Sequence, residues 1–124
     1  MYKIVVDRTH TLIRLDVTGM LTADSVERLA GDMTARVMEA QLERYGLIID
    51  VSQSPVQAPD TIAAIAGHLP AMTRARAVAI VTGAMLARLQ LRRIFDPSFT
   101  RFVATHGEAL DWLLSAKEPV ALSA

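Results

Sequence analysis

Cysteine is absent from the sequence, which excludes disulfide bonds, thiolate metal sites and thiol catalysis. Net charge is absent as well, because 13 basic residues balance 13 acidic ones, so no overall field draws the chain to nucleic acid or to an anionic membrane. No apolar run approaches the roughly 18 residues of a membrane span. The opening MYKIVVDRTH also lacks the basic, apolar and cleavage regions of a secretion signal. We therefore expect a soluble, cytoplasmic protein with no membrane span and no nucleic-acid partner.

The motifs of several common enzyme classes are also missing. The sequence has no Gly-x-Gly-x-x-Gly, no Gly-x-x-x-x-Gly-Lys-Ser/Thr and no Gly-x-Ser-x-Gly. Its histidines, His10, His68 and His106, are far apart in the sequence and form no His-x-x-x-His pair. We place His10 in a hairpin turn and His106 in the first turn of the last helix. Asp50 alone makes neither a metal site nor a catalytic base, so the sequence predicts a non-enzymatic protein with no metal and no cofactor.

The length and apolar content indicate one folded domain. A chain of 124 residues with 52% apolar residues is long enough to bury a core without metal or disulfide support. We assign residues 1–124 to a single domain, with a core at about 2–115 and a short C-terminal tail at 117–124. Positive charge gathers locally, which predicts a positive face, although solvated surface arginines explain the same pattern. The arginines concerned are Arg74, Arg76, Arg88, Arg92, Arg93 and Arg101.

Short β-branched runs alternate with helical repeats along the chain. The first two runs predict an antiparallel hairpin, and in the second run Arg14 and Asp16 alternate with apolar residues, so one face is more polar. Thr22 before the first helix and Thr105 with Glu108 before the last are typical helix-capping residues. The predicted strands are residues 2–7, 11–17, 45–51, 76–82 and 100–105. The predicted helices are residues 22–41, 59–70, 84–95 and 105 onward.

The resulting order is β-β-α-β-α-β-α-β-α. Strands that alternate with helices after an opening hairpin predict an α/β fold with right-handed crossovers. We expect a mixed, mostly parallel sheet with one antiparallel edge, packed with helices.

Several stretches in this order resemble one protein family. They are the opening hairpin, VTGMLTADSVERL after it, GLIIDVS before the long loop, RAVAIVTGAMLARLQLRRIF, and RFVATHGEALDWL. Together, over residues 2–115, they resemble the SpoIIAA-like group of STAS and SEC14 domain proteins. The resemblance implies a single STAS-like domain, a small mixed sheet with helices packed against it.

The resemblance also implies a candidate switch. STAS anti-sigma-factor antagonists exchange partners when a hydroxyl residue at the start of the second helix is phosphorylated. Asp50-Val51-Ser52 resembles their Asp-x-Ser stretch, and Asp60-Thr61 falls where their Asp-Ser-Ser-Gly begins, although the serine pair and the glycine are missing here. Helix capping and turn formation explain the same residue types. The candidate switch or partner loop comprises Asp50, Ser52, Ser54, Asp60 and Thr61.

The third predicted helix is apolar around much of its girth. Ala87, Leu91 and Phe95 form one stripe, but Met85 and Leu89 lie off it. Excess apolar surface often marks a partner or a ligand, while packing of the first turn against the sheet explains it equally well. The candidate apolar ligand or dimer surface comprises Met85, Leu89, Phe95 and Trp112.

Three functional hypotheses follow. The first is a non-enzymatic regulatory domain, resembling anti-sigma-factor antagonists, that binds a protein partner or itself as a homodimer and carries a phosphorylatable loop. The second is a carrier of a small apolar or lipid-like ligand, as the SEC14 side of the resemblance implies. The third, an enzyme, requires at least two ionisable side chains that converge on Asp50.

Overall fold

The strands form one sheet in which spatial order follows chain order. The computed structural model describes residues 1–115, and the predicted tail at 117–124 lies outside them. Across these residues the strand order is β1-β2-β3-β4-β5, with β1 antiparallel to β2 and the other neighbouring pairs parallel. This is the predicted mixed sheet with one antiparallel edge. The strands are β1 (Tyr2–Asp7), β2 (Leu12–Thr18), β3 (Tyr45–Gln53), β4 (Ala75–Val81) and β5 (Thr100–Val103).

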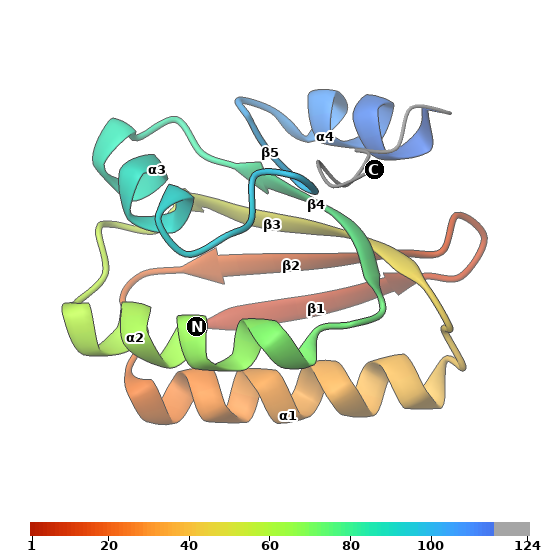
Figure 1. Ribbon diagram of the computed structural model, residues 1–124, viewed down its shortest axis with the longest axis horizontal. Helices are drawn as coiled ribbons and strands as arrows, with labels where there is room; N and C mark the ends of the chain where they lie inside the picture. Colours follow the sequence, from red (N-terminus) through yellow and green to blue (C-terminus); the bar gives the residue numbers. More distant parts are fainter. Residues whose placement is uncertain (116–124) are drawn as a thin grey trace.

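The helices follow the strands in the predicted alternation. α1 and α2 lie side by side along one face of the sheet, and α4 lies on the opposite side (Figure 1). As far as residues 1–115 go, no helix has the length and apolar character needed to cross a membrane. The α/β fold class is confirmed. The helices are α1 (Ala23–Glu39), α2 (Pro59–His68), α3 (Met85–Arg92) and α4 (His106–Leu114), with a 3-10 turn (Leu69–Ala71) after α2.

Threonine caps begin two of the helices, as predicted. The Thr22 hydroxyl accepts from the Ser25 amide at 3.1 Å, which supplies a partner for an N–H group at the start of α1 that no helical carbonyl can reach. The Thr105 hydroxyl does the same for the Glu108 amide at 3.2 Å in α4. α2 differs, because it starts at Pro59 on the N-cap Ala58, which offers no side-chain acceptor.

α3 is shorter than the predicted 84–95. The amides of Ile94 and Phe95 both donate to the Leu91 carbonyl, at 3.1 and 3.0 Å, which tightens the chain into a turn after Arg92. Pro97 then disfavours helical geometry at the residue before it. The sequence pattern predicted a longer helix because Phe95 is buried in the core, at the spacing of a helical residue, although α3 ends at Arg92.

The two faces of the sheet carry different side chains because successive strand residues point in opposite directions. Toward α1, α2 and α3 lies a large apolar cluster that includes Ile13, Leu47 and Ile80. Toward α4 lies a smaller cluster that includes Ile48 and Leu113. β2 and β3 thus place polar residues on the α4 face near their carboxyl ends, where this smaller cluster does not cover them.

Candidate functional site

The residues of the predicted switch loop separate onto opposite faces of the sheet. β3 continues to Gln53, two residues past the predicted strand, so Ser52 lies in the strand with Asp50 rather than in the loop. Their side chains lie on the α4 face, where Asp50 contacts His106. Thr61 lies in the first turn of α2 on the other face. The loop therefore does not form one continuous site.

Thr61 and Ser54 make internal hydrogen bonds. Thr61 is 2% exposed, and its hydroxyl donates to the Leu21 carbonyl at 2.9 Å. The hydroxyl therefore ties α2 to the start of α1 and is closed to a kinase in this conformation. The Ser54 hydroxyl donates to the Val17 carbonyl at 2.9 Å. Asp60 is exposed in the first turn of α2 and does not cap the helix, because Ala58 is the N-cap. Phosphorylation of this loop stays a prediction, and Ser52 is its exposed hydroxyl.

A second group of polar residues meets on the α4 face. Asp16 on β2 and Asp50 on β3 are partners in the parallel pairing of these strands, and His106 is the first residue of α4. His106 Nε2 lies 2.7 Å from Asp50 Oδ2 and 3.9 Å from Asp16 Oδ1. All three side chains are partly buried. We call Asp16, Asp50 and His106 the carboxylate–histidine cluster.

Neighbouring groups hold both carboxylates in place. The amide and the hydroxyl of Ser52 donate to Asp50 Oδ1 at 2.8 and 2.6 Å, which leaves Oδ2 facing His106. Arg14 Nε donates to Asp16 Oδ1 at 2.9 Å. Burial raises the pKa of Asp50, but the hydrogen bonds from Ser52 and His106 together outweigh it, so the pKa lies below the usual value of an aspartate. Asp50 is therefore a carboxylate at neutral pH.

The arrangement does not activate a nucleophile. In a catalytic triad the hydroxyl contacts the imidazole, whose other nitrogen contacts the carboxylate. Here Asp50 stands between Ser52 and His106, so its carboxylate accepts from the serine and the imidazole does not touch that hydroxyl through any hydrogen bond in the described residues. Two ionisable side chains, Asp16 and His106, do converge on Asp50, as the enzyme hypothesis requires. Their arrangement lacks the contact between a hydroxyl and the imidazole that acyl transfer by a triad needs.

An apolar cavity lies on the opposite face, between the sheet and the helices α1, α2 and α3. Its volume is about 350 Å³, it is partly open to solvent, and nearly all of its wall is apolar. Its lining on α1 extends from Val26 to Met38, which corresponds to roughly 18 Å along a helix axis. The cavity is therefore elongated. Its apolar lining includes Leu15, Val17, Leu29, Met33, Val37, Leu47, Ile49, Ile62, Ile65, Leu91 and Phe95.

Gln57 and Arg74 are the polar residues at the two ends of the cavity, whose wall also includes Thr34, Ser54 and His68. Near the start of α1 the side-chain oxygen of the buried Gln57 accepts from the Leu21 amide at 2.8 Å. The backbone N–H of Gln57 donates to the side-chain oxygen of Gln90 on α3, and the backbone C=O of Gln57 accepts from the side-chain amide of Gln90. Near the end of α1 the wall includes the exposed Arg74, whose Nη1 donates to the Leu42 carbonyl at 3.2 Å. Gln57 is thus an uncharged polar group at one end, and Arg74 supplies a cation at the other.

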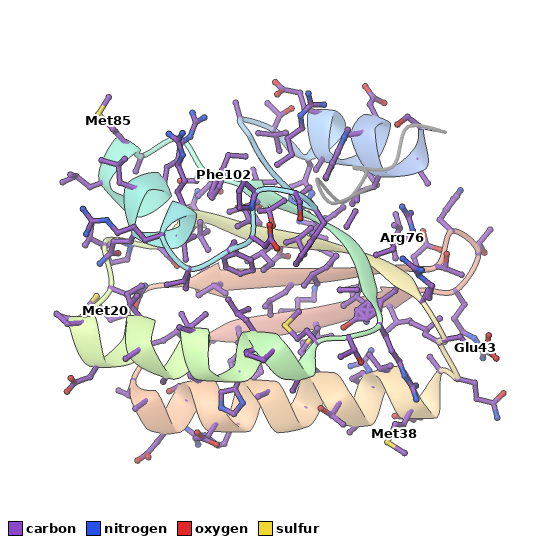
Figure 2. The ribbon with its side chains drawn as sticks, viewed as in Figure 1. Met20, Met38, Glu43, Arg76, Met85 and Phe102 are labelled. Atoms are coloured by element: carbon purple, nitrogen blue, oxygen red, sulfur yellow. The ribbon has the colours of Figure 1, made fainter. Side chains whose placement is uncertain are left out.

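The predicted apolar surface is not one surface in the structure. Met85 and Leu89 are 75% and 42% exposed, and Met85 projects away from the body of the molecule (Figure 2). Phe95 is buried and lines the cavity, whereas Trp112 packs against the α4-side cluster. One arginine of the predicted positive face, Arg101, stacks on an aromatic ring. Its guanidinium lies 5.6 Å from the centroid of the Trp112 ring, within the range of a cation–π contact.

Sequence reasoning missed the cluster because its members are distant in the chain. The signals were present separately: Asp16 on the polar face of its strand, Asp50 near the end of the next parallel strand, and His106 at a helix start. Only the strand register brings Asp16 opposite Asp50. Nothing in the sequence predicted the cavity, since the apolar residues that line it follow the same pattern as residues that fill a core.

The sheet order, the single antiparallel edge and the helix positions define a SpoIIAA-like fold. An uncharacterised protein of the DUF3478 family from Shewanella loihica PV-4, described as having a SpoIIAA-like fold, matches with a TM-score of 0.68 and 17% identity, over 91% of this chain and 92% of that chain. The anti-sigma factor antagonist SpoIIAA in its unphosphorylated form matches with a TM-score of 0.62 and 14% identity, over 91% and 97%. No protein-family profile matches the chain, and no curated protein matches it in sequence. The predicted fold resemblance is confirmed.

Proposed function

We propose that the protein is a non-enzymatic carrier of an elongated apolar molecule, such as a fatty acid, bound between the sheet and α1, α2 and α3. The observation that supports this proposal is the cavity of about 350 Å³, which lies in the range of small-molecule sites and has mainly apolar walls with a few polar groups at its ends. The fold is shared with an anti-sigma factor antagonist and with an uncharacterised protein, so the fold alone does not choose the ligand.

The energetic cost of an empty cavity favours an occupant. At about 24 cal/mol per Å³ of residual cavity, 350 Å³ corresponds to roughly 8 kcal/mol. This figure is the upper limit for a dry cavity, since the part open to solvent exposes apolar surface instead. It is comparable with the whole stability of a typical domain, about 5–15 kcal/mol. Water fills such a space poorly, because it needs two to four polar partners. An apolar ligand removes the cost.

The polar ends of the cavity favour a ligand with one anionic end. Arg74 supplies a charge at the end of the cavity near Leu42, while Gln57 at the other end has its hydrogen bonds satisfied inside the protein. A carboxylate beside Arg74 gains a charge-assisted hydrogen bond and stays near solvent. The apolar chain then extends along α1 toward Gln57.

Organic extraction and native mass spectrometry test the proposal. We expect the purified chain to carry a bound mass of lipid size, and the delipidated chain to bind dodecanoic acid with one-to-one stoichiometry. Ala30→Leu fills part of the cavity from α1, and we expect it to weaken binding at least tenfold without loss of stability, because alanine and leucine are both strong helix formers.

Ala35→Leu is the matched control, because Ala35 is exposed on the same helix and does not line the cavity. We expect it to bind dodecanoic acid as the unmodified chain does. Equal affinity of both variants, or a folded protein that takes up no fatty acid, would contradict the carrier function.

A second candidate is the regulatory role, in which the chain binds a protein partner or a second copy of itself. Its support is the exposed apolar face of α3, where Met85, Leu86 and Leu89 are 75%, 65% and 42% exposed. Sedimentation equilibrium tests the homodimer, which Leu86→Glu should dissociate.

Incubation with cell lysate and ATP, followed by phosphosite mapping, tests the switch. An unmodified Ser52 would count against it, since Thr61 is buried.

A further inference from the structure

The carboxylate–histidine cluster has the composition of a metal site. One imidazole nitrogen and two carboxylate oxygens, one from each of Asp16, Asp50 and His106, all lie within 4.8 Å of one another. They come from β2, β3 and α4, so the ligand positions are fixed by the sheet register and by the docking of a helix rather than by a flexible loop. A site built on regular elements holds its geometry better than one built on loops.

The distances require only small adjustments to admit a cation. Zinc ligands lie about 2.0–2.2 Å from the metal, so ligand atoms in tetrahedral geometry stand about 3.4 Å apart. His106 Nε2 lies 2.7 Å from Asp50 Oδ2 and 3.9 Å from Asp16 Oδ1. One of these separations must widen and the other must shorten, each by less than 1 Å, and the two carboxylate oxygens, which lie within 4.8 Å of each other, must come to the same spacing. Rotation of the two side chains at the partly exposed rim supplies such movements.

The surroundings of the cluster match those of metal-binding carboxylates. Ligating carboxylates are usually held by hydrogen bonds from neighbouring groups, which fix the oxygen that faces the metal. Ser52 does this for Asp50 with two hydrogen bonds to Oδ1, which leave Oδ2 facing His106. Arg14 holds Asp16 with one hydrogen bond to Oδ1, the oxygen that lies 3.9 Å from His106 Nε2, so this oxygen has to serve both Arg14 and a bound cation. The carboxylates of Asp16 and Asp50 and the guanidinium of Arg14 together carry a formal charge of −1. A bound divalent cation changes this total to +1.

We infer that Asp16, Asp50 and His106 bind one divalent transition-metal cation of the zinc class and leave a coordination position open toward solvent. Imidazole and carboxylate together suit Zn²⁺, Ni²⁺ and Cu²⁺, whereas Mg²⁺ and Ca²⁺ prefer sites made of oxygen ligands alone. The site lies on the face of the sheet opposite the cavity, so it is independent of the carrier function.

Zinc titration of the chelator-treated full chain tests this assignment. We expect one equivalent of Zn²⁺ to bind at neutral pH, with a rise in melting temperature, and Mg²⁺ and Ca²⁺ not to compete. His106→Gln should abolish stoichiometric binding. Ser52→Ala should weaken it by about 10-fold or more, because Asp50 then loses the side-chain hydrogen bond that orients it.

His68→Gln and His10→Gln are the matched controls. His68 pairs with Glu27 at 3.0 Å and His10 with Asp7 at 2.8 Å, so each is a histidine beside a single carboxylate. We expect both variants to bind zinc as the unmodified chain does. Zinc soaked into crystals, located by anomalous scattering, should lie between His106 and the two aspartates, which checks the site without any variant. Stoichiometric binding that survives His106→Gln, a loss that follows His68→Gln, or no anomalous peak in the cluster would overturn the assignment.

Discussion

Gly46 in β3 lies close to a leucine of β2 and to a leucine of α4. A Cβ added there would lie 2.7 Å from Leu12 Cδ2 and 3.3 Å from Leu113 Cδ2. The first separation is shorter than real Cβ contacts allow, and both leucines are almost completely buried. Neither side chain moves without disturbing the α4-side cluster, so the absence of a side chain at Gly46 leaves the space that these two leucines occupy.

We expect Gly46→Ala to lower the free energy of unfolding by about 1–3 kcal/mol, the usual cost of an overpacked core. Gly31→Ala on α1 is the matched change, because nothing lies within 4 Å of its added Cβ and the position is exposed. There alanine should raise the free energy of unfolding by about 1 kcal/mol through helix propensity. Urea unfolding followed by circular dichroism measures both. Shifts of the same sign and size would show that Gly46 is not tightly packed.

At the scale of whole elements, the helices differ in how they begin. Thr22 and Thr105 cap α1 and α4 with their hydroxyls, while Ala58 leaves α2 without a side-chain acceptor. Ala58 already has the extended backbone typical of a cap, with φ −65° and ψ 150°. The start of α2 is therefore the weakest of these three helix starts.

Ala58→Ser should raise the free energy of unfolding by about 0.5–1 kcal/mol, because the hydroxyl supplies the missing acceptor. Thr105→Ala should lower it by about 1 kcal/mol for the opposite reason. Thermal and urea unfolding of both variants give the comparison. An unchanged stability in Ala58→Ser would mean that the first N–H groups of α2 already have partners.

The same elements show what the sequence can predict. The alternation in β2, the apolar centres of β3 and β4 and the threonine caps are local patterns, and each placed its element within a few residues. Asp50 was singled out, but its partners were not, because the pairing of Asp16 with Asp50 depends on strand register. Thr61 was predicted as a member of the switch loop, and local sequence did not indicate that it is buried and bonded to the Leu21 carbonyl. Local patterns thus predicted elements, while long-range register and packing made the sites.

At the scale of the molecule, the sheet separates a polar site from an apolar one. The carboxylate–histidine cluster lies on the α4 face, and the cavity lies on the face covered by α1 and α2. A ligand in one site therefore does not contact the other. The two activities proposed for this chain are expected to be separable by substitution.

Pressure should unfold the unliganded protein readily. The volume change of unfolding grows with the internal void that disappears, within a usual range of about −20 to −100 mL/mol. A cavity of about 350 Å³ places this chain toward the larger magnitude. Ala30→Leu should reduce that magnitude and Ala35→Leu should not, as measured by high-pressure NMR. A volume change near the small end of the range, equal in both variants, would show that the cavity is hydrated.

The contact between Arg101 and Trp112 has one more consequence. Trp112 is the only tryptophan in the sequence, and it lies on α4, the helix that begins with His106. The Arg101 guanidinium lies 5.6 Å from the centre of its ring. Fluorescence excited at wavelengths that tryptophan absorbs and tyrosine does not therefore comes from one emitter on the α4 face, and it should respond to any shift of α4 when a cation reaches His106. Filling the cavity on the far side of the sheet should leave that emission unchanged, so the protein contains its own optical reporter for one of its two faces.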